Sequence, residues 1–381
     1  MRPCYAPFVR ALVCEAPGDV ALRDVPSPEP GPGDVLVRVG AALTCGTDLK
    51  IARRGHPKIP FPLTLGHEWA GVVEKAGAGA AWAPGTRVTS AVSAPCGACA
   101  ACREGRENLC ETAFDRPLFG AFADFLLVPE RLAKRGLRRV PDGMPDEAAA
   151  LLDPLASVVR GLARARSARG RAAREEDVLI AGTGPIAAML FLLLRGKEEE
   201  ETGRGAERRI VVAGRRAERL AFFEGRKAEV ARLGVASRDV PGGAPRPVFT
   251  FEENPPSPSR IDHRREEGAR RFSLVVDTTG DPGVIEALPA LAADGGTVLL
   301  FAGLPAGARV AIDAHAVHYR EVSIVGSFHY TPREADEALA LLSLGAIPAA
   351  EIVSARRPLS EWQAAFDLAR AGTALKVAVI P

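Results

Sequence analysis

The chain has 381 residues, of which 49 are Lys or Arg and 47 are Asp or Glu, so its formal charge is +2. This length predicts two or three domains, and a hydrophobic share of 47% excludes wholesale disorder. The balanced charge gives no electrostatic basis for binding nucleic acid. Residues 1–13 lack the apolar core of a secretory signal. The most apolar stretch, Val178–Leu194, is short for a membrane span and contains Gly182, Gly184 and Pro185, so we expect a cytoplasmic protein without a membrane partner.

Short strands bounded by Gly and Pro are expected over the first 150 residues. Val35–Ala41, Gly71–Ala76 and Arg87–Val92 are apolar or alternating runs that end at such residues. This pattern predicts a compact β-rich domain.

The pattern changes at Asp177. Asp177–Ala181 is typical of a buried strand, and a glycine turn leads from it into a helix over Pro185–Leu194, with proline at the permitted first position. Strands and helices then alternate, which predicts a parallel sheet built from βαβ units. The remaining expected elements are strand Ile210–Ala213, helix Ala217–Phe223, strand Leu274–Asp277, helix Gly283–Leu291, strand Thr297–Phe301, helices Pro332–Ser343 and Leu359–Ala371, and strand Lys376–Ile380.

Two stretches fit no such pattern. Lys197–Arg209 is a run of charges, and Val240–Arg271 is rich in Pro and Arg with little periodicity. We expect solvated surface insertions, because loops tolerate extra residues. A partner-binding or partly disordered segment is the alternative.

Four of the seven cysteines lie close together, and their two-residue gaps let thiolates converge on one ion. They are Cys96, Cys99, Cys102 and Cys110. Four thiolates with no open position are typical of a structural zinc site. An iron–sulfur cluster and unligated thiols are the alternatives.

A second set of metal donors is more dispersed. Cys45 lies in a TCGTD segment, His67 in LGHEW, and Asp153 in the otherwise apolar LLDPLAS. Alone, each is weak, since a single Cys or His is more often an ordinary buried residue. Together they offer the three protein ligands of a catalytic zinc, which keeps a fourth position open.

The segment from Gly182 to Ala187 (GTGPIA) follows a strand and opens a helix, the context that a dinucleotide-binding turn requires. Gly182 would make the tight turn, and Gly184 would let the backbone approach a pyrophosphate. We expect cofactor contacts from Gly182, Thr183, Gly184, Pro185 and Ile186. A plain turn between strand and helix is the alternative.

The end of the next strand bears on the choice of cofactor. It runs into Gly214, Arg215 and Arg216, with no carboxylate for a ribose hydroxyl. Arginines at this place favour the extra phosphate of NADP. NAD remains the alternative, in which the two arginines are only solvated and Glu218 contacts the ribose.

These motifs together resemble the zinc-containing medium-chain dehydrogenase/reductase superfamily over nearly the whole chain. Cys45–Asp48 resembles the first catalytic-zinc element, Gly66–Glu68 the second, and Cys96–Cys110 the structural zinc lobe. Asp153–Leu155 resembles the acidic element of polyol and threonine dehydrogenases. The resemblance implies an α/β protein with a GroES-like catalytic domain (residues 1–156 and 327–381) and a Rossmann cofactor domain (157–326).

The resemblance also implies roles for single residues. Thr47 would pass on the substrate proton, Asp48 would orient His67, Glu68 would be a fourth ligand or contact the metal through water, and Lys376 would reach the cofactor pyrophosphate. A solvated lysine is the alternative for Lys376. Many relatives continue the proton relay with a histidine where this chain has Lys50, and His56 is the nearest substitute.

The expected function is a hydride transfer between NAD(P) and the CH–OH group of a small polyol, cyclitol or other hydroxylated substrate. A catalytic zinc would lower the pKa of the bound alcohol so that it forms an alkoxide. The expected cofactors are two zinc ions per chain and NADP, and the family suggests a homodimer or homotetramer. An NADPH-dependent aldehyde or ketone reductase and a non-catalytic binding protein of the same fold are the alternatives.

Overall fold

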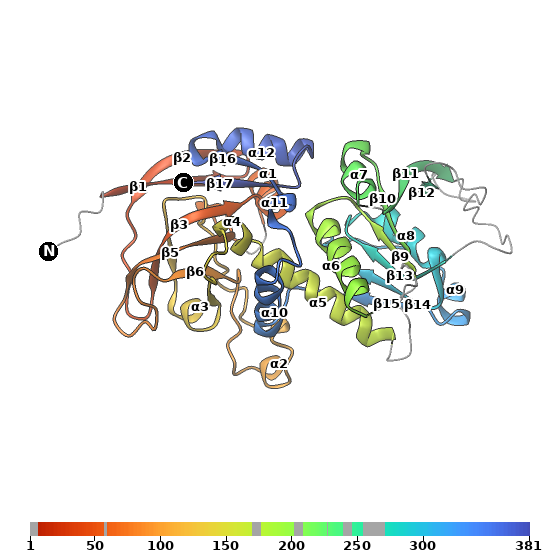
Figure 1. The fold of residues 1–381 in the computed structure, drawn as a ribbon, viewed down its shortest axis with the longest axis horizontal. Coiled ribbons are helices and arrows are strands. Elements are labelled where there is room, and N and C mark those ends of the chain that lie inside the picture. The colour runs from red at the N-terminus through yellow and green to blue at the C-terminus, as the bar shows by residue number, and fades with distance from the viewer. Residues whose placement is uncertain are drawn as a thin grey trace. The chain divides into compact units, whose positions relative to one another are not determined.

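The computed structural model describes residues 7–56, 59–169, 177–201, 209–226, 228–238, 246–253 and 271–381. The chain divides into two compact units (Figure 1). The first contains the chain up to Val159 together with His329–Pro381, and the second contains Arg160–Phe328. In the described part of the chain, no helix has the length and apolar character needed to cross a membrane.

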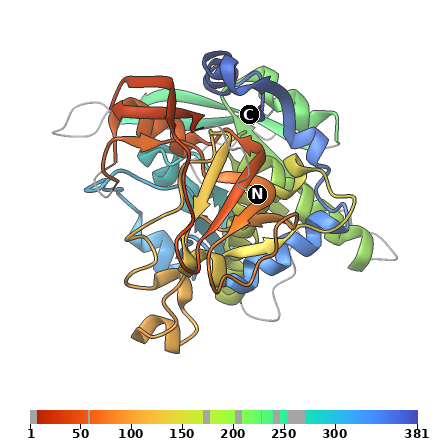
Figure 2. The same cartoon turned by 90° about the vertical axis from the view of Figure 1, so that its left-hand side faces the viewer.

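The first unit is rich in strands. Its larger sheet runs in the order β16 (Val353–Pro358), β17 (Lys376–Ile380), β3 (Val35–Leu43), β5 (Glu68–Ala76), β6 (Arg87–Ser90) and β8 (Leu137–Arg139), with β7 (Phe125–Val128) also paired to β3. A smaller sheet has the order β2 (Asp19–Pro26), β1 (Phe8–Ala16) and β4 (Leu63–Thr64). Figures 1 and 2 show the dark-blue C-terminal segment among the red and orange N-terminal strands. The two ends of the chain therefore build one unit.

Short helices connect the strands of the first unit. They are α1 (Gly46–Arg54), α2 (Ala100–Arg103), α3 (Glu130–Arg135), α4 (Asp146–Ala149), α10 (Pro332–Ser343), α11 (Ala349–Ile352) and α12 (Trp362–Ala371), with 3-10 turns η1 (Glu107–Leu109) and η2 (Leu359–Glu361). Helix α12 packs on β16 and β17 and adds Phe366 to a core that also holds Trp69 and Phe122. The longer helix α5 (Leu152–Arg169) begins in this unit.

The second unit is built on a seven-stranded sheet. The strand order is β12 (Arg246–Glu253), β11 (Glu229–Arg238), β10 (Arg209–Gly214), β9 (Asp177–Ala181), β13 (Phe272–Asp277), β14 (Ala292–Leu300) and β15 (Ser323–Gly326). All neighbours pair in parallel except β12, which is antiparallel to β11. Without β12, this is the order of a doubly wound dinucleotide-binding sheet. The helices are α6 (Pro185–Glu201), α7 (Ala217–Glu224), α8 (Pro282–Leu291) and α9 (Ala314–Tyr319).

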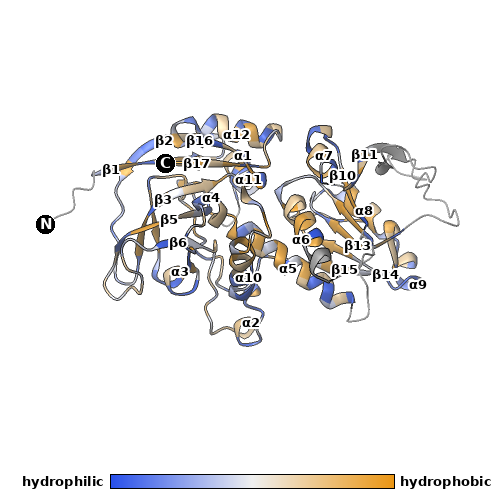
Figure 3. Cartoon of the chain, in the orientation of Figure 1, coloured by the Kyte–Doolittle hydropathy of each residue, from blue (hydrophilic) through white to orange (hydrophobic). Residues whose placement is uncertain are grey.

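The strands at the centre of this sheet are apolar because helices cover them. Val178 and Ile180 of β9 and Val275 and Val276 of β13 are completely buried. Figure 3 shows β10 and β13 as hydrophobic ribbons. Such continuous apolar runs are typical of parallel strands that are buried on both faces.

The structure describes parts of the two unpatterned stretches, and whether they are solvated insertions stays a prediction. Helix α6 continues to Glu201, five residues into the charged run. Strand β12 lies within the Pro- and Arg-rich stretch and pairs with β11 along eight residues of each strand. Residues 202–208, 239–245 and 254–270 of these stretches lie outside the described residues.

Candidate metal and cofactor sites

The four clustered cysteines converge in the loop around α2. The sulfur atoms of Cys96, Cys99, Cys102 and Cys110 all lie within 4.8 Å of one another. Cys99 caps α2, and Cys110 follows η1, so two short helical turns bring the sulfurs together. The described cysteines are free thiols, without disulfides.

Backbone amides favour the ionised form of two of these sulfurs, those of Cys96 and Cys110, whereas burial raises the pKa of Cys102. The N–H groups of Ala98 and Cys99 donate to Cys96 Sγ at 3.3 Å each, and these bonds lower the pKa of Cys96 to about 6. Cys110 Sγ accepts from the Cys96 N–H at 3.2 Å. Four converging sulfurs, with one thiol already poised to ionise, fit a tetrahedral zinc ion.

A second group of donor atoms lies where three strands end or begin. In the register of the sheet, Leu43 at the end of β3 pairs with Glu68 of β5 on one side and with Ala378 of β17 on the other. The neighbouring residues of these strands therefore meet. One donor atom each of Cys45, His67 and Glu68 lies within 4.8 Å of the others.

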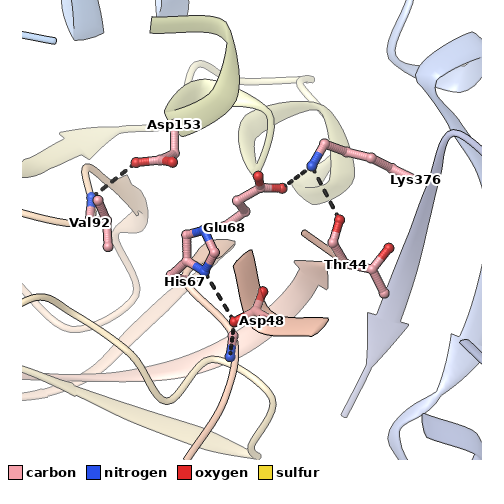
Figure 4. A network of polar contacts seen from close by, with 8 residues as sticks. Thr44, Asp48, His67, Glu68, Val92, Asp153 and Lys376 are labelled. Atoms are coloured by element: carbon pink, nitrogen blue, oxygen red, sulfur yellow. Dashed lines mark hydrogen bonds and ion pairs between the residues drawn. The ribbon is translucent and has the colours of Figure 1, made fainter. Parts of the chain in front are cut away.

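His67 is held in one orientation by Asp48. Its Nδ1 lies 3.1 Å from Asp48 Oδ1, which also accepts the Gly66 N–H at 3.1 Å (Figure 4). Gly66 has φ of +93°, and a Cβ there would lie 2.6 Å from the Phe122 nitrogen, so only glycine fits. The expected Asp48–His67 contact is thus present, and Nε2 is left for a ligand.

Burial lowers the pKa of His67, but the Asp48 and Cys45 charges and hydrogen bonds outweigh it and hold the pKa well above its usual value. The surroundings of His67 therefore favour positive charge. A metal cation bound to His67 Nε2 would be attracted by the same negative charges.

Glu68 and Lys376 form an ion pair inside the first unit. The exposed fractions of the two residues are 1% and 2%, and the Lys376 ammonium contacts Glu68 Oε2 and the Thr44 carbonyl oxygen (Figure 4). Burial raises the pKa of Glu68, although the charge of Lys376 opposes this effect. Burial lowers the pKa of Lys376, but the charge and hydrogen bond of Glu68 together with the charges of Cys45 and Asp48 outweigh it and raise the pKa. The alternative of a solvated lysine is therefore wrong.

Asp153 lies beside this group, on the second residue of α5. Its Oδ1 accepts the Val92 N–H at 3.2 Å and the hydroxyl of Tyr330. Asp153 is not part of the set of donors within 4.8 Å, but its charge contributes to the raised pKa of Glu68. In Figure 4 its second oxygen faces Glu68 and His67.

The charges of the second group suit a dication. Three buried carboxylates, of Asp48, Glu68 and Asp153, lie in this group, where Asp48 contacts His67 and Glu68 contacts Lys376 (Figure 4). Asp48 Oδ2 is buried and has no hydrogen-bond partner among the residues that the structure describes. Buried negative charge of this kind is costly unless it is compensated. The sulfur, imidazole and carboxylate donors are also those of zinc, so the residues fit this ion.

The proton relay is less well defined. Thr47, the second residue of α1, and Lys50 are both exposed. Their roles stay predictions. Phe119 packs against His67 with ring centroids 5.2 Å apart, and it provides an apolar wall beside the donor group.

The glycine turn of the second unit has the expected form. Gly182 follows β9 with φ of +117°, and its N–H donates to the Ala213 carbonyl at 2.8 Å. A Cβ on Gly182 would lie 2.1 Å from Thr278 Oγ1, so the close approach of two strand ends requires glycine. The turn leads directly into α6, whose N-terminus favours anions. Thr183, Gly184, Pro185 and Ile186 form the rest of this turn and the first helical residues.

Arginines gather beyond the end of β10. Arg215 and Arg216 are exposed, and Arg215 lies 3.7 Å from Asp281. Sequence reasoning missed Arg219, whose Nη1 would lie 3.9 Å from a Cβ on Gly184. Burial and the charge of Arg216 lower the pKa of Arg219. The glycine turn therefore lies in positive surroundings.

Sequence reasoning also missed a contact beside Asp153. His329 Nε2 lies 2.9 Å from Ser93 Oγ, and burial lowers the pKa of His329 to about 4. His329 and Tyr330 belong to the GSFHYTP segment, but their partners lie 236 and 177 residues away. No local sequence signal connects such positions.

Comparison with known proteins agrees with the fold. Residues 31–141 match the alcohol dehydrogenase GroES-like domain. The chain is 32% identical over 348 residues to D-altritol 5-dehydrogenase of Agrobacterium fabrum (strain C58), covering 90% of this chain and 91% of that one. It is 28% identical over 370 residues to L-threonine 3-dehydrogenase of Anaeromyxobacter sp. (strain Fw109-5), covering 95% and 96%.

A solved structure shows the same likeness. A zinc-binding dehydrogenase of Sinorhizobium meliloti 1021, bound to NADP, has a TM-score of 0.75 at 29% identity and covers 98% of this chain and 99% of its own. The fold is that of an alcohol-dehydrogenase-type oxidoreductase. The chain belongs to the zinc-containing medium-chain dehydrogenase/reductase superfamily, so the predicted family and fold class are confirmed.

Proposed function

We propose that this enzyme is a zinc- and NADP-dependent dehydrogenase that transfers hydride between the cofactor and the CH–OH group of a small polyol, cyclitol or similar hydroxylated substrate. The observation that carries the proposal is the buried donor group of the first unit, with Cys45 and His67 at its centre. The relatives with the names D-altritol 5-dehydrogenase and L-threonine 3-dehydrogenase support a hydroxylated substrate.

Cys45, His67 and Asp153 would hold the catalytic zinc. Glu68 is the competing third donor, because it lies within 4.8 Å of the other two. The charge of Glu68 is already compensated by Lys376, whereas among the described residues the Asp153 carboxylate receives hydrogen bonds from two neutral groups, the Val92 N–H and the Tyr330 hydroxyl. This difference favours Asp153 as the ligand and Glu68 as a close neighbour of the metal.

When bound, zinc would supply a Lewis acid that lowers the pKa of an alcohol hydroxyl. Asp48 keeps His67 in the tautomer that presents Nε2. Phe119 limits water beside His67, and Thr47 would accept the hydroxyl proton and pass it to solvent, to which it is exposed. A second zinc would be held by Cys96, Cys99, Cys102 and Cys110 as a structural ion.

The glycine turn and α6 would hold the cofactor pyrophosphate. Arg215, Arg216 and Arg219 supply positive charge near the place where the adenosine ribose of a dinucleotide lies in this fold. The NADP in the Sinorhizobium meliloti structure also favours NADP over NAD. The contact of Lys376 with the pyrophosphate stays a prediction from the family resemblance, because in the structure its ammonium is buried and paired with Glu68.

Metal analysis and spectrophotometry test the proposal together. We expect two zinc ions per chain and growth of reduced-nicotinamide absorbance when NADP is mixed with a panel of polyols, cyclitols and threonine. Asp153→Ala should lose one zinc and the activity, whereas the exposed Asp142→Ala should keep both. Growth with NAD alone would overturn the cofactor assignment.

Other outcomes would contradict the reaction itself. Two zinc ions with no alcohol oxidation, but with NADPH-dependent reduction of aldehydes, would identify a carbonyl reductase. One zinc ion and no cofactor binding would identify a binding protein of the same fold.

A further inference from the structure

The two carboxylate oxygens of Asp153 differ in their surroundings. One faces the donor group of Cys45, His67 and Glu68, and the other is held by hydrogen bonds from other residues. Oδ1 accepts both the Val92 N–H and the Tyr330 hydroxyl. Oδ2 accepts no hydrogen bond from the described residues and faces His67 and Glu68 in Figure 4. The terminal torsion of an Asp side chain is broad, so such donors decide which oxygen faces a ligand.

Tyr330 is itself held firmly on its N-terminal side. The residue is buried, with 3% of its surface exposed. Its neighbour His329 has φ of +53°, an uncommon backbone conformation for a residue other than glycine, and bonds Ser93 through Nε2. The His329 ring also packs edge-on against Phe114 at 4.9 Å. Since Ser93 follows Val92, the segments that carry the two donors to Asp153 are bonded to each other.

The C-terminal side of Tyr330 is held by a helix cap. Thr331 is the N-cap of α10, and Glu334 Oε2 accepts its N–H at 2.7 Å. This reciprocal cap defines where α10 starts and therefore where the tyrosine side chain leaves the backbone. Supports of this kind on both sides are typical of residues that orient metal ligands.

We propose that Tyr330 is a positioning residue for the metal site: its hydroxyl holds Asp153 Oδ1, so that Oδ2 is presented to the ion as a single-oxygen ligand. This inference rests on the proposed function, since it needs a metal ion beside Cys45 and His67. The role is distinct from packing, because the aromatic ring would pack without its hydroxyl. Nothing in the reaction requires Tyr330 to touch the substrate.

The test uses Tyr330→Phe, which removes only the hydroxyl, and Tyr319→Phe as the matched control. Tyr319 lies in the second unit and is 71% exposed. The readouts are the affinity of the second site for zinc in a chelator competition, the visible absorption of Co²⁺ placed in that site, and the melting temperature of the metal-free protein. Each is repeated in an Asp153→Asn background.

We expect Tyr330→Phe to weaken zinc binding at the second site by about 10–100-fold and to change the Co²⁺ spectrum. The metal-free protein should melt close to the Tyr319→Phe control. In the Asp153→Asn background the same substitution should add nothing, because the carboxylate that it orients is gone. If Tyr330→Phe does not fold, Ser93→Ala loosens the His329 anchor and should weaken the affinity in the same direction.

Unchanged affinity and spectrum in Tyr330→Phe would overturn the inference while leaving the proposed function intact. An equal loss of affinity in the Asp153→Asn background would also overturn it, since the tyrosine would then act on the fold alone. Failure of the proposed function appears earlier in the experiment: the unmodified protein would bind no metal at the second site, and the inference would fall with it.

Discussion

Removing the Lys376 charge should destabilise the first unit far more than removing an exposed lysine. In Lys376→Met the Glu68 carboxylate would remain buried without its cation, and breaking such a pair costs about 3–5 kcal/mol. The variant can avoid part of this cost by binding a proton at Glu68 in the folded state. Protonation costs about 1.4 kcal/mol for each pH unit above the unfolded-state pKa of about 4.3, which sets an upper limit on the loss of stability. The limit is therefore about 4.4 kcal/mol near pH 7.5 and about 1.6 kcal/mol near pH 5.5.

The sign of the pH dependence follows from the raised pKa of Glu68. An acid whose folded pKa is raised binds more protons in the folded state, so its stability is highest below the unfolded pKa and is lost as the pH rises through the folded pKa. Without Lys376 the pKa of Glu68 rises further, because the charge that lowers this pKa is gone while the burial that raises it remains. The difference in stability between Lys376→Met and the unmodified protein should thus shrink on acidification.

The assay is urea unfolding of chelator-treated protein, because a cation near Glu68 would offset the same charge. Tryptophan fluorescence reports the first unit alone, since Trp69, Trp82 and Trp362 are the three tryptophans of the chain and all lie in that unit.

Lys134→Met is the matched control. Its exposed pair with Glu130 is typical of interactions worth about 0.5 kcal/mol or less. A loss below about 1 kcal/mol for Lys376→Met near pH 7.5, or a loss that does not shrink near pH 5.5, would refute the reasoning.

Three further predictions concern the other groups. Cys110→Ser should lower the zinc content by one ion and lower the melting temperature, and retention of both zinc ions in metal analysis would contradict the structural site. Gly182→Ala should weaken dinucleotide binding in a fluorescence titration by at least about 10-fold, because its Cβ would collide with Thr278; unchanged affinity would show that the turn adapts. Arg215→Ala combined with Arg216→Ala should raise the Kd for NADP much more than the Kd for NAD, and an equal effect on both would mean that these arginines do not bind the extra phosphate.

Local patterns predicted the parts of the fold that depend on local chemistry. Strand Asp177–Ala181, the glycine turn and the proline-initiated helix were all visible because apolar runs, glycine and proline act within a few residues. Strand β12 was missed because it is a short run within a long stretch that is rich in Pro and Arg, and its pairing with β11 is a long-range contact that no local pattern shows.

The sequence predicted which residues could form the candidate site, but not which of them contact one another. Cys45, His67 and Asp153 were recognisable as possible ligands. The pairing of Glu68 with Lys376 joins residues 308 positions apart and depends on β3 lying between β5 and β17. From the sequence, Lys376 could be either a contact of the cofactor pyrophosphate or a solvated lysine. Its pairing with Glu68 follows from the register of three strands, which the sequence does not show.

The arrangement of the first unit has a consequence during synthesis. Its central strand β3 is made early, but its neighbour β17 and the Lys376 that neutralises Glu68 come only after the whole second unit. At about 5–20 residues per second, roughly 10–40 s separate Val159 from Lys376. During that interval Ala42 and Leu43 of β3 lack their partners in β17 and Glu68 lacks its cation, while the second unit, which is continuous in sequence, is being synthesised. The first unit can therefore complete its larger sheet only after the second unit has been synthesised.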